Sequence, residues 1–410
     1  MRKRMEAMAT EEKIRIVKGG VTAPKGFKAA GLACGIKQSG RKDIAVVVSD
    51  KLANASAVFT TNRVAAAPIH ISKKHLANGK AQAITINSGV ANAYTGKQGN
   101  ADAMRMAEIT AQALGISPSD VIVGSTGVIG NLLPMQRIEE GIKKAVQELA
   151  YDGGQNAAEA IMTTDTFAKE FAISFKIDGH EVKIGGMAKG SGMIAPNMAT
   201  MLAVLTTDAT VSSEMLSGFL KSAVNKSFNS ITVDGDTSTN DMVVILANGE
   251  SGVQIDASSS DLFQHALDTV CIELAKLIVR DGEGATKFIE VNVVGALTEP
   301  DAKKAAMAIA NSNLVKTAFF GEDANWGRVV AAVGYSSAEV DPDVIDIHYG
   351  DVQLIGKGSI LAYDNAKVKE VLKARDIKVT VNLNLGSGSA RVWTCDFSYD
   401  YVKINAEYHT

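Results

Sequence analysis

Hydrophobic residues along the chain form short runs that are separated by amphipathic segments. Short runs rich in Val, Ile and Thr predict strands, and apolar residues three or four positions apart predict helices. The predicted strands are 44–49, 57–60, 82–87, 121–124, 168–177, 181–186, 201–208, 230–233, 242–247, 288–294, 377–385, 391–397 and 401–404. The predicted helices are 100–114 (capped by Asn100), 134–149, 212–226, 259–280, 301–311 and 364–375.

The order of these elements indicates the fold class. The pair Asp178-Gly179 lies between two alternating runs, which is a strong signal for a β-hairpin. Strands and helices follow one another in small groups with frequent hairpins. This order favours a mixed α/β architecture of layered α+β sheets and helices over a doubly wound parallel sheet.

Composition places the chain among globular proteins. The 410 residues are enough for two or three core-sized units. The chain is 46% hydrophobic and 21% charged, which is ordinary for a folded domain. The net charge is −3 and no basic stripe occurs, so we expect no nucleic-acid or membrane-surface partner.

The cysteines, the histidines and the N-terminal residues indicate the compartment and whether a membrane or a metal is involved. Cys34, Cys271 and Cys395 are odd in number and far apart, which predicts buried thiols in a reducing compartment. The charged start at 1–6 is followed by no apolar segment of the signal-peptide kind, and no apolar run reaches membrane-spanning length. These features predict a cytoplasmic protein. The six histidines form no HExxH pair, so we expect no catalytic metal.

A glycine-rich segment near the middle of the chain leads into a buried run. Lys189-Gly190-Ser191-Gly192 precedes Thr200, which stands at the start of the apolar run 201–208. If the Ala199–Thr200 bond were cut, the new α-amine of Thr200 could act as general base for its own hydroxyl. A threonine that only satisfies strand propensity remains the plain alternative.

Three other positions have side chains suited to acyl transfer. Ser125-Thr126-Gly127 is predicted as a small-residue turn after a strand, where a hydroxyl and a backbone N–H can converge on an oxyanion. Lys189 can hold a substrate carboxylate, and the carboxylate of Glu283 suits an ammonium group. The plain alternatives are a tight connection for 125–127, a solvated surface lysine for Lys189 and a solvated residue after a helix for Glu283.

The segment 189–208 resembles the self-cleavage site of the ornithine acetyltransferase family, the glutamate N-acetyltransferases of the arginine pathway. Blocks 87–93 and 321–328 resemble the same family, and the likeness spans about residues 20–410. Val90 and the step 322–324 depart from the family pattern. The resemblance implies a self-cleaving fold with an N-terminal-nucleophile threonine, cut between Ala199 and Thr200 into an alpha chain, 1–199, and a beta chain, 200–410.

The resemblance also implies a reaction and a set of site residues. The implied site residues are Thr200 as nucleophile, Thr126 and Gly127 as oxyanion hole, and Thr163, Lys189, Thr200, Glu283, Asn405 and Thr410 as substrate-binding residues. The reaction is a ping-pong transfer of acetyl from N2-acetyl-L-ornithine to L-glutamate through an acetyl-Thr200 intermediate, without a cofactor. Some family members also accept acetyl from acetyl-CoA, which makes them bifunctional. The implied assembly is a heterotetramer of two alpha and two beta chains.

Other classes of function make different predictions. A self-processed aminopeptidase or amidase would use water as acceptor, so glutamate would not accelerate loss of acetylornithine. A non-enzymatic oligomer component would remain one intact chain. A nucleotide-binding protein is disfavoured because 186–191 lacks the Walker spacing, and 234–245 lacks the Gly and Glu of a calcium loop. No flexible linker lies near residue 199, so two cleaved halves should share one core.

Overall fold

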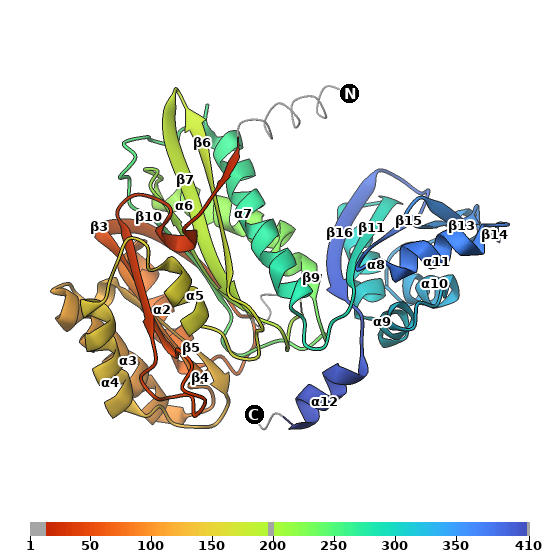
Figure 1. The fold of residues 1–410 in the computed structure, drawn as a ribbon. Coiled ribbons are helices and arrows are strands. Elements are labelled where there is room, and N and C mark those ends of the chain that lie inside the picture. Colours follow the sequence, from red (N-terminus) through yellow and green to blue (C-terminus); the bar gives the residue numbers. More distant parts are fainter. Residues whose placement is uncertain (1–13, 196–200, 408–410) are drawn as a thin grey trace.

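The computed structural model describes residues 14–195 and 201–407 (Figure 1). The strands are β1 Arg15–Val17, β2 Phe27–Leu32, β3 Ile44–Phe59, β4 Lys80–Val90, β5 Val121–Val128, β6 Lys169–Ile177, β7 His180–Lys189, β8 Leu202–Thr207, β9 Ile231–Thr232, β10 Met242–Ala247, β11 Phe288–Ala296, β12 Asp346–Tyr349, β13 Val352–Gly356, β14 Ser359–Ile360, β15 Asp376–Asn382 and β16 Gly388–Cys395. The α-helices are α2 Ala67–His75, α3 Gly96–Leu114, α4 Met135–Gln147, α5 Gly154–Ala160, α6 Ser213–Lys226, α7 Ser260–Arg280, α8 Glu299–Asn311, α9 Asn313–Phe320, α10 Trp326–Gly334, α11 Asn365–Lys373 and α12 Tyr399–Glu407.

Two sheets organise the chain. A nine-stranded sheet has the order β1-β6-β7-β8-β10-β3-β4-β5, with β2 paired to β3. A seven-stranded sheet has the order β14-β13-β12-β15-β11-β16-β9. Figure 1 shows the seven-stranded sheet with helices α8 to α11 on the right and the larger sheet on the left. The mixed α/β class predicted from the sequence is confirmed.

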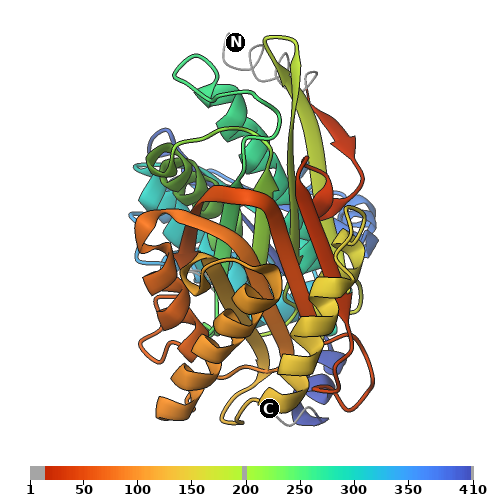
Figure 2. The same cartoon turned by 90° about the vertical axis from the view of Figure 1, so that its left-hand side faces the viewer.

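The larger sheet folds over itself, because β3 is long enough to serve two layers. Its first half pairs with β2, and its second half, from Asn54 to Phe59, pairs with β10. Side chains from both layers form the core between them, since Val47 and Ile84 share one cluster with Val204 and Val244. Figure 2, turned by 90°, shows helices in front of the layer formed by β3, β4 and β5.

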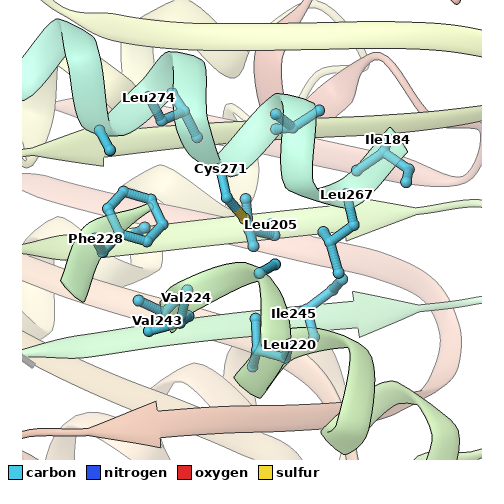
Figure 3. Packing of buried hydrophobic residues seen from close by; sticks show 14 of the residues in the cluster. Ile184, Leu205, Leu220, Val224, Phe228, Val243, Ile245, Leu267, Cys271 and Leu274 are labelled. Carbon is cyan, nitrogen blue, oxygen red and sulfur yellow. The ribbon is translucent and has the colours of Figure 1, made fainter. Parts of the chain in front are cut away.

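Helices cover the outer faces of both layers. Along β10, Val243 and Ile245 point to the cluster with α6 and α7, and Val244 and Leu246 point to the core between the layers. This alternation follows from the two-residue period of a strand, and a continuous apolar run is typical of a strand buried on both faces. Figure 3 shows residues of β7, β8 and β10 packed against α6 and α7, including Leu267.

Segments on both sides of residues 196–200 belong to the same sheet. β7 pairs antiparallel with β8, with Lys189 opposite Leu202, and β10 pairs with β3. The strand pairing therefore joins segments before and after these residues in one sheet. The boundary between the predicted alpha and beta chains lies outside the described residues and stays a prediction.

Several predicted elements are confirmed by local chemistry. Asp178 and Gly179 have φ of 51° and 83°, the left-handed pair that a two-residue hairpin requires. The Ser212 side chain accepts a hydrogen bond from Met215 N and caps α6. The Asp364 side chain caps α11 in the same way, through the N–H groups at the start of the helix.

Other predicted elements are wrong in extent. The runs 44–49 and 57–60 belong to one strand, β3. The polar stretch between the two runs is partly exposed but still belongs to the strand. Helix α3 starts at Gly96 after Thr95 rather than at Asn100, since the Asn92 amide binds Gly99 O and fixes the chain one turn earlier. The sequence pattern also gave no signal for α10 and for β12 to β14.

Two corrections fall near the site. Ser125-Thr126-Gly127 is the end of β5 rather than a turn, because β4 and β5 continue to pair as Ser88 with Thr126 and Gly89 with Gly127. The run 401–404 belongs to helix α12, not to a strand. Its half-buried residues, Tyr401 and Ile404, are three positions apart, which is helical spacing. No helix within the described ranges is long and apolar enough to cross a membrane.

Candidate active site

One pocket gathers six of the residues singled out from the sequence. Its space, open solvent at the mouth included, is about 670 Å³. The predicted residues that line it are Thr126, Gly127, Thr163, Lys189, Glu283 and Asn405. They come from the ends of β5 and β7, from loops after α5 and α7, and from α12. Ala199, Thr200 and Thr410 lie outside the described residues.

The end of β5 brings a hydroxyl and a strained glycine to the pocket. Gly127 has a φ of +128°, and a Cβ at this position would lie 2.3 Å from the carbonyl carbon of Gly89. Only glycine fits that close approach to β4. The backbone beside Thr126 is fixed from the other side, because the Asn240 side-chain amide donates to Ser125 O at 2.8 Å and to Ala91 O at 2.6 Å.

Lys189 is a buried cation at the pocket wall. It is 4% exposed, and its ammonium has no hydrogen-bond acceptor among the described residues. Burial lowers its pKa, and the neighbouring acidic groups, Asp165 foremost, oppose that shift. An anionic group in the pocket would be an electrostatic partner for this ammonium.

Glu283 and Asn405 also line the pocket and contact each other. The Asn405 Nδ2 donates to Glu283 Oε2 at 2.8 Å, and Glu283 N donates to Ser191 O at 3.0 Å. Gly192 leaves room for this carboxylate, because a Cβ there would lie 2.3 Å from Glu283 Oε2. Thus a cation, Lys189, and a carboxylate, Glu283, both line the pocket.

The start of β8 is fixed next to the pocket. Met201 N donates to Asp241 Oδ1 at 2.9 Å, and Leu202 pairs with Lys189 across the strands. Burial raises the pKa of Asp241 well above its usual value, and the Met201 N–H and the charge of Lys189 only partly oppose this. The residue that follows Thr200 is therefore anchored beside Lys189.

Asp234 supports the wall that carries Met193. Its carboxylate accepts from Met193 N at 2.5 Å and from Ile194 N at 2.8 Å, and Tyr401 Oη donates to it at 3.4 Å. These bonds hold Met193 at a φ of 57°, a left-handed conformation that costs free energy in a non-glycine residue. Burial raises the pKa of Asp234 to about 6, although the backbone N–H bonds oppose this shift.

This shift predicts a pH-dependent stability. The pKa of Asp234 is higher in the folded chain than the ordinary aspartate value of 3.8, so the stabilisation is complete below 3.8 and is lost as pH rises through about 6. Asp234→Asn does not titrate. From pH 4 to pH 7 the wild type should therefore lose stability relative to this variant, by no more than about 3 kcal/mol. Melting curves of both proteins across this range check it, and a constant difference would contradict it.

The structure adds lining residues that the sequence left unassigned. They are Ala91, Ile129, Thr164, Gly192, Met193, Ser238, Thr239 and Asn240. The segment 234–241 had been considered only as a calcium loop and set aside. Its actual contributions, the Asn240 bonds to two backbone carbonyls and the Asp241 bond to Met201, depend on contacts between strands distant in sequence. The nearby Thr164 Oγ1 is 2.6 Å from Ser191 Oγ.

Three kinds of comparison relate the chain to known proteins. The model of the ArgJ family matches residues 28–410. The arginine biosynthesis bifunctional protein ArgJ of Caldanaerobacter subterraneus is 52% identical over 404 residues, which are 97% of this chain and 100% of that protein. The glutamate N-acetyltransferase of Methanocaldococcus jannaschii is 49% identical over 410 residues, with 97% and 100% coverage.

Solved structures give shorter matches. The ArgJ of Bacillus halodurans is 44% identical, with a TM-score of 0.48, and covers 50% of this chain and 97% of its own. The ornithine acetyltransferase of Mycobacterium tuberculosis, solved with ornithine, is 42% identical, with a TM-score of 0.42, and covers 45% and 98%.

The layered fold and the pocket that gathers the predicted residues are those of a mixed α/β enzyme with a small-molecule site. More particularly, the extent of the family match and the relatives near 50% identity show that the chain belongs to the ArgJ family. The resemblance found in the sequence is thereby confirmed.

Proposed function

We propose that this chain transfers an acetyl group from N2-acetyl-L-ornithine to L-glutamate in arginine biosynthesis. The observation that carries the proposal is that Lys189, Glu283, Thr126 and Gly127 line one pocket. An amino acid with an α-carboxylate and a side-chain ammonium matches these charges. Relatives that cover nearly the whole chain are named for arginine biosynthesis and for glutamate acetylation.

Each residue has a role in the proposed complex. The Lys189 ammonium binds the α-carboxylate, and Glu283, held by Asn405, binds the side-chain ammonium of ornithine. The Thr163 side of the pocket contacts the substrate backbone. Thr126 and the Gly127 N–H stabilise the oxyanion of the tetrahedral intermediate. Thr410 is the remaining substrate-binding residue of the proposal.

The chemistry follows two half-reactions. The Thr200 hydroxyl attacks the acetyl carbonyl, its proton passes through the Thr200 α-amine to the leaving amine, and the amide bond breaks to release ornithine. Glutamate then enters the same pocket, its amine attacks the acetyl ester, and the Thr200 hydroxyl is restored. Because both substrates share an α-carboxylate and an α-nitrogen, Lys189 can serve each in turn.

The same hydroxyl accounts for maturation. In the proposed cleavage, Thr200 attacks the Ala199 carbonyl, the peptide becomes an ester, and hydrolysis frees chains 1–199 and 200–410. The α-amine needed as base exists only after this step. We further propose that two alpha and two beta chains assemble in the cytoplasm. No cofactor is required, and acetyl-CoA is a second acetyl donor to be tested.

Asn240 should affect catalysis through the oxyanion hole. Asn240→Ala removes the bonds to Ser125 O and Ala91 O, so Thr126 and Gly127 lose their support. We expect kcat to fall roughly 10- to 100-fold, with KM changed less than about threefold, since the loss is confined to the transition state. Steady-state kinetics measure both constants.

A matched control separates this effect from a general loss of packing. Asn248 is also buried and donates to a backbone carbonyl, Lys25 O, but it does not line the pocket. Asn248→Ala should lower the melting temperature without lowering kcat. Equal losses of kcat in both variants would contradict the assigned role of Asn240.

The function itself is tested by product analysis. Purified protein is incubated with N2-acetyl-L-ornithine, with and without L-glutamate. The proposal predicts stoichiometric ornithine and N-acetylglutamate, and ornithine release that depends on glutamate. Release of acetate at the same rate without glutamate would identify a hydrolase instead. Replacing acetylornithine by acetyl-CoA in the same assay decides whether the chain is bifunctional.

A further inference from the structure

A buried group of charged residues lies directly behind the pocket. Asp165 Oδ1 accepts from Lys169 Nζ at 2.7 Å and from Gly190 N at 2.7 Å, and Oδ2 accepts from Thr163 N at 2.8 Å. One carboxylate therefore fixes the backbone at Thr163 and the backbone directly after Lys189. These are the two segments that carry predicted substrate-binding residues on that side of the pocket.

Lys169 extends this connection to the third wall. Its ammonium also donates to Asp281 Oδ2 at 2.5 Å, and all three side chains are at most 2% exposed. Asp281 accepts from Thr166 N at 3.0 Å and from the Thr166 hydroxyl. Because Asp281 lies two residues before Glu283, the Asp165–Lys169–Asp281 triad joins the walls of Thr163, Lys189 and Glu283.

Among the charged groups around Lys189, Asp165 does most to keep the Lys189 ammonium protonated. The titratable groups that face Lys189 are Asp165, Asp241 and Glu283, with Lys169 and Lys37 as the neighbouring cations. Asp241 favours its neutral form because of its burial. Burial alone would raise the pKa of Asp165, but Lys189, Lys169 and its hydrogen bonds outweigh burial and hold this pKa below its usual value.

We propose that Asp165 is a positioning residue for substrate binding: it keeps Lys189 charged and correctly placed without itself bonding the ammonium that holds the substrate carboxylate. Asp165 holds the backbone of Gly190 and the amine of Lys169, but no hydrogen bond joins it to Lys189 Nζ within the described residues. It therefore supplies negative charge without occupying the ammonium. This inference rests on the proposed function, in which Lys189 binds an α-carboxylate.

The test is Asp165→Asn, which keeps the shape and removes the charge. With the largest opposing charge gone, Lys189 should lose its proton at lower pH than in the wild type. We expect KM for acetylornithine to rise at least tenfold at pH 8, with kcat at saturation changed less than about threefold. The KM difference should shrink as pH is lowered to 6.5, where Lys189 regains its proton. A merely structural role would not give this pH dependence.

Two controls make the result decisive. Glu170→Gln neutralises a half-buried carboxylate five residues further along that does not line the pocket, and its KM profile should equal that of the wild type. Asp165→Asn/Lys169→Gln/Asp281→Asn neutralises the whole triad without leaving an unpaired buried charge, so it should fold and show the same displaced KM profile. A wild-type KM profile in a folded variant, or failure of both variants to fold, would overturn the proposal.

Calorimetric titration with ornithine distinguishes this inference from the proposed function. Ornithine binding reports on Lys189 even if acetyl transfer is absent. If the wild type binds ornithine but exchanges no acetyl group, the proposed function fails, and the pH dependence of ornithine affinity in Asp165→Asn still tests the role of Asp165. If Asp165→Asn binds ornithine as tightly as the wild type at pH 8, the inference fails while the function stands.

Discussion

Thr200→Ala should abolish acetyl exchange and leave the chain as a single 43.1 kDa polypeptide. The methyl group has neither a nucleophilic oxygen for the Ala199 carbonyl nor one for the acetyl group. Because both maturation and turnover depend on this hydroxyl, we expect a loss of at least about 10⁴-fold in kcat. A denaturing gel and the acetylornithine–glutamate exchange assay measure the two effects on one preparation.

Thr200→Ser is the matched control. It keeps the hydroxyl and removes only a methyl group, so both cleavage and exchange should persist at reduced rates. Melting curves of the two variants should be similar, since neither changes the described core. Substantial acetyl exchange by Thr200→Ala would show that another group carries the acetyl.

Lys189→Met should have the second largest effect, on substrate binding. The substrate carboxylate would enter a buried wall that holds Asp165 and Glu283 but no ammonium facing it. An unpaired buried charge costs about 3–5 kcal/mol, so KM for acetylornithine and for glutamate should rise roughly 10²- to 10³-fold. Initial rates over a range of each substrate give both constants.

The fold should tolerate this change. Lys189 makes no side-chain hydrogen bond within the described residues, and methionine fills a similar volume, so the melting temperature should change little. Lys176→Met removes a lysine from the exposed side of β6 and should leave KM unaltered. If Lys189→Met raised KM for only one of the two substrates, the shared carboxylate subsite would be wrong.

Local patterns were sufficient to predict much of the fold. The Asp178-Gly179 hairpin, the strand 242–247 and the long helix after Ser259 are specified by residues close in sequence, and the structure has them within a few residues. Long-range pairing was not predictable in this way. β3 continues through a polar stretch because β4 and β10 pair with its two ends, and neither partner can be identified from residues 44–59 alone.

The residues of the site likewise divide into those identified from the sequence and those identified only in the folded structure. Resemblance to a family identified Thr126, Lys189 and Glu283, and the fold brings them to one pocket. The supporting residues were missed because their roles arise only across the fold. Asn240 acts on a carbonyl 115 positions away, and Lys169 reaches Asp281 across 112 positions. No spacing rule connects residues that meet only after the sheets have formed.

The most direct test of the central claim is the intact mass of the purified protein before and after incubation with N2-acetyl-L-ornithine alone. We expect two fragments, 1–199 and 200–410, and an added mass of one acetyl group on the second fragment only, removed when glutamate is added. An uncleaved chain that exchanges acetyl at full rate, or an acetyl group found on the first fragment, would contradict it.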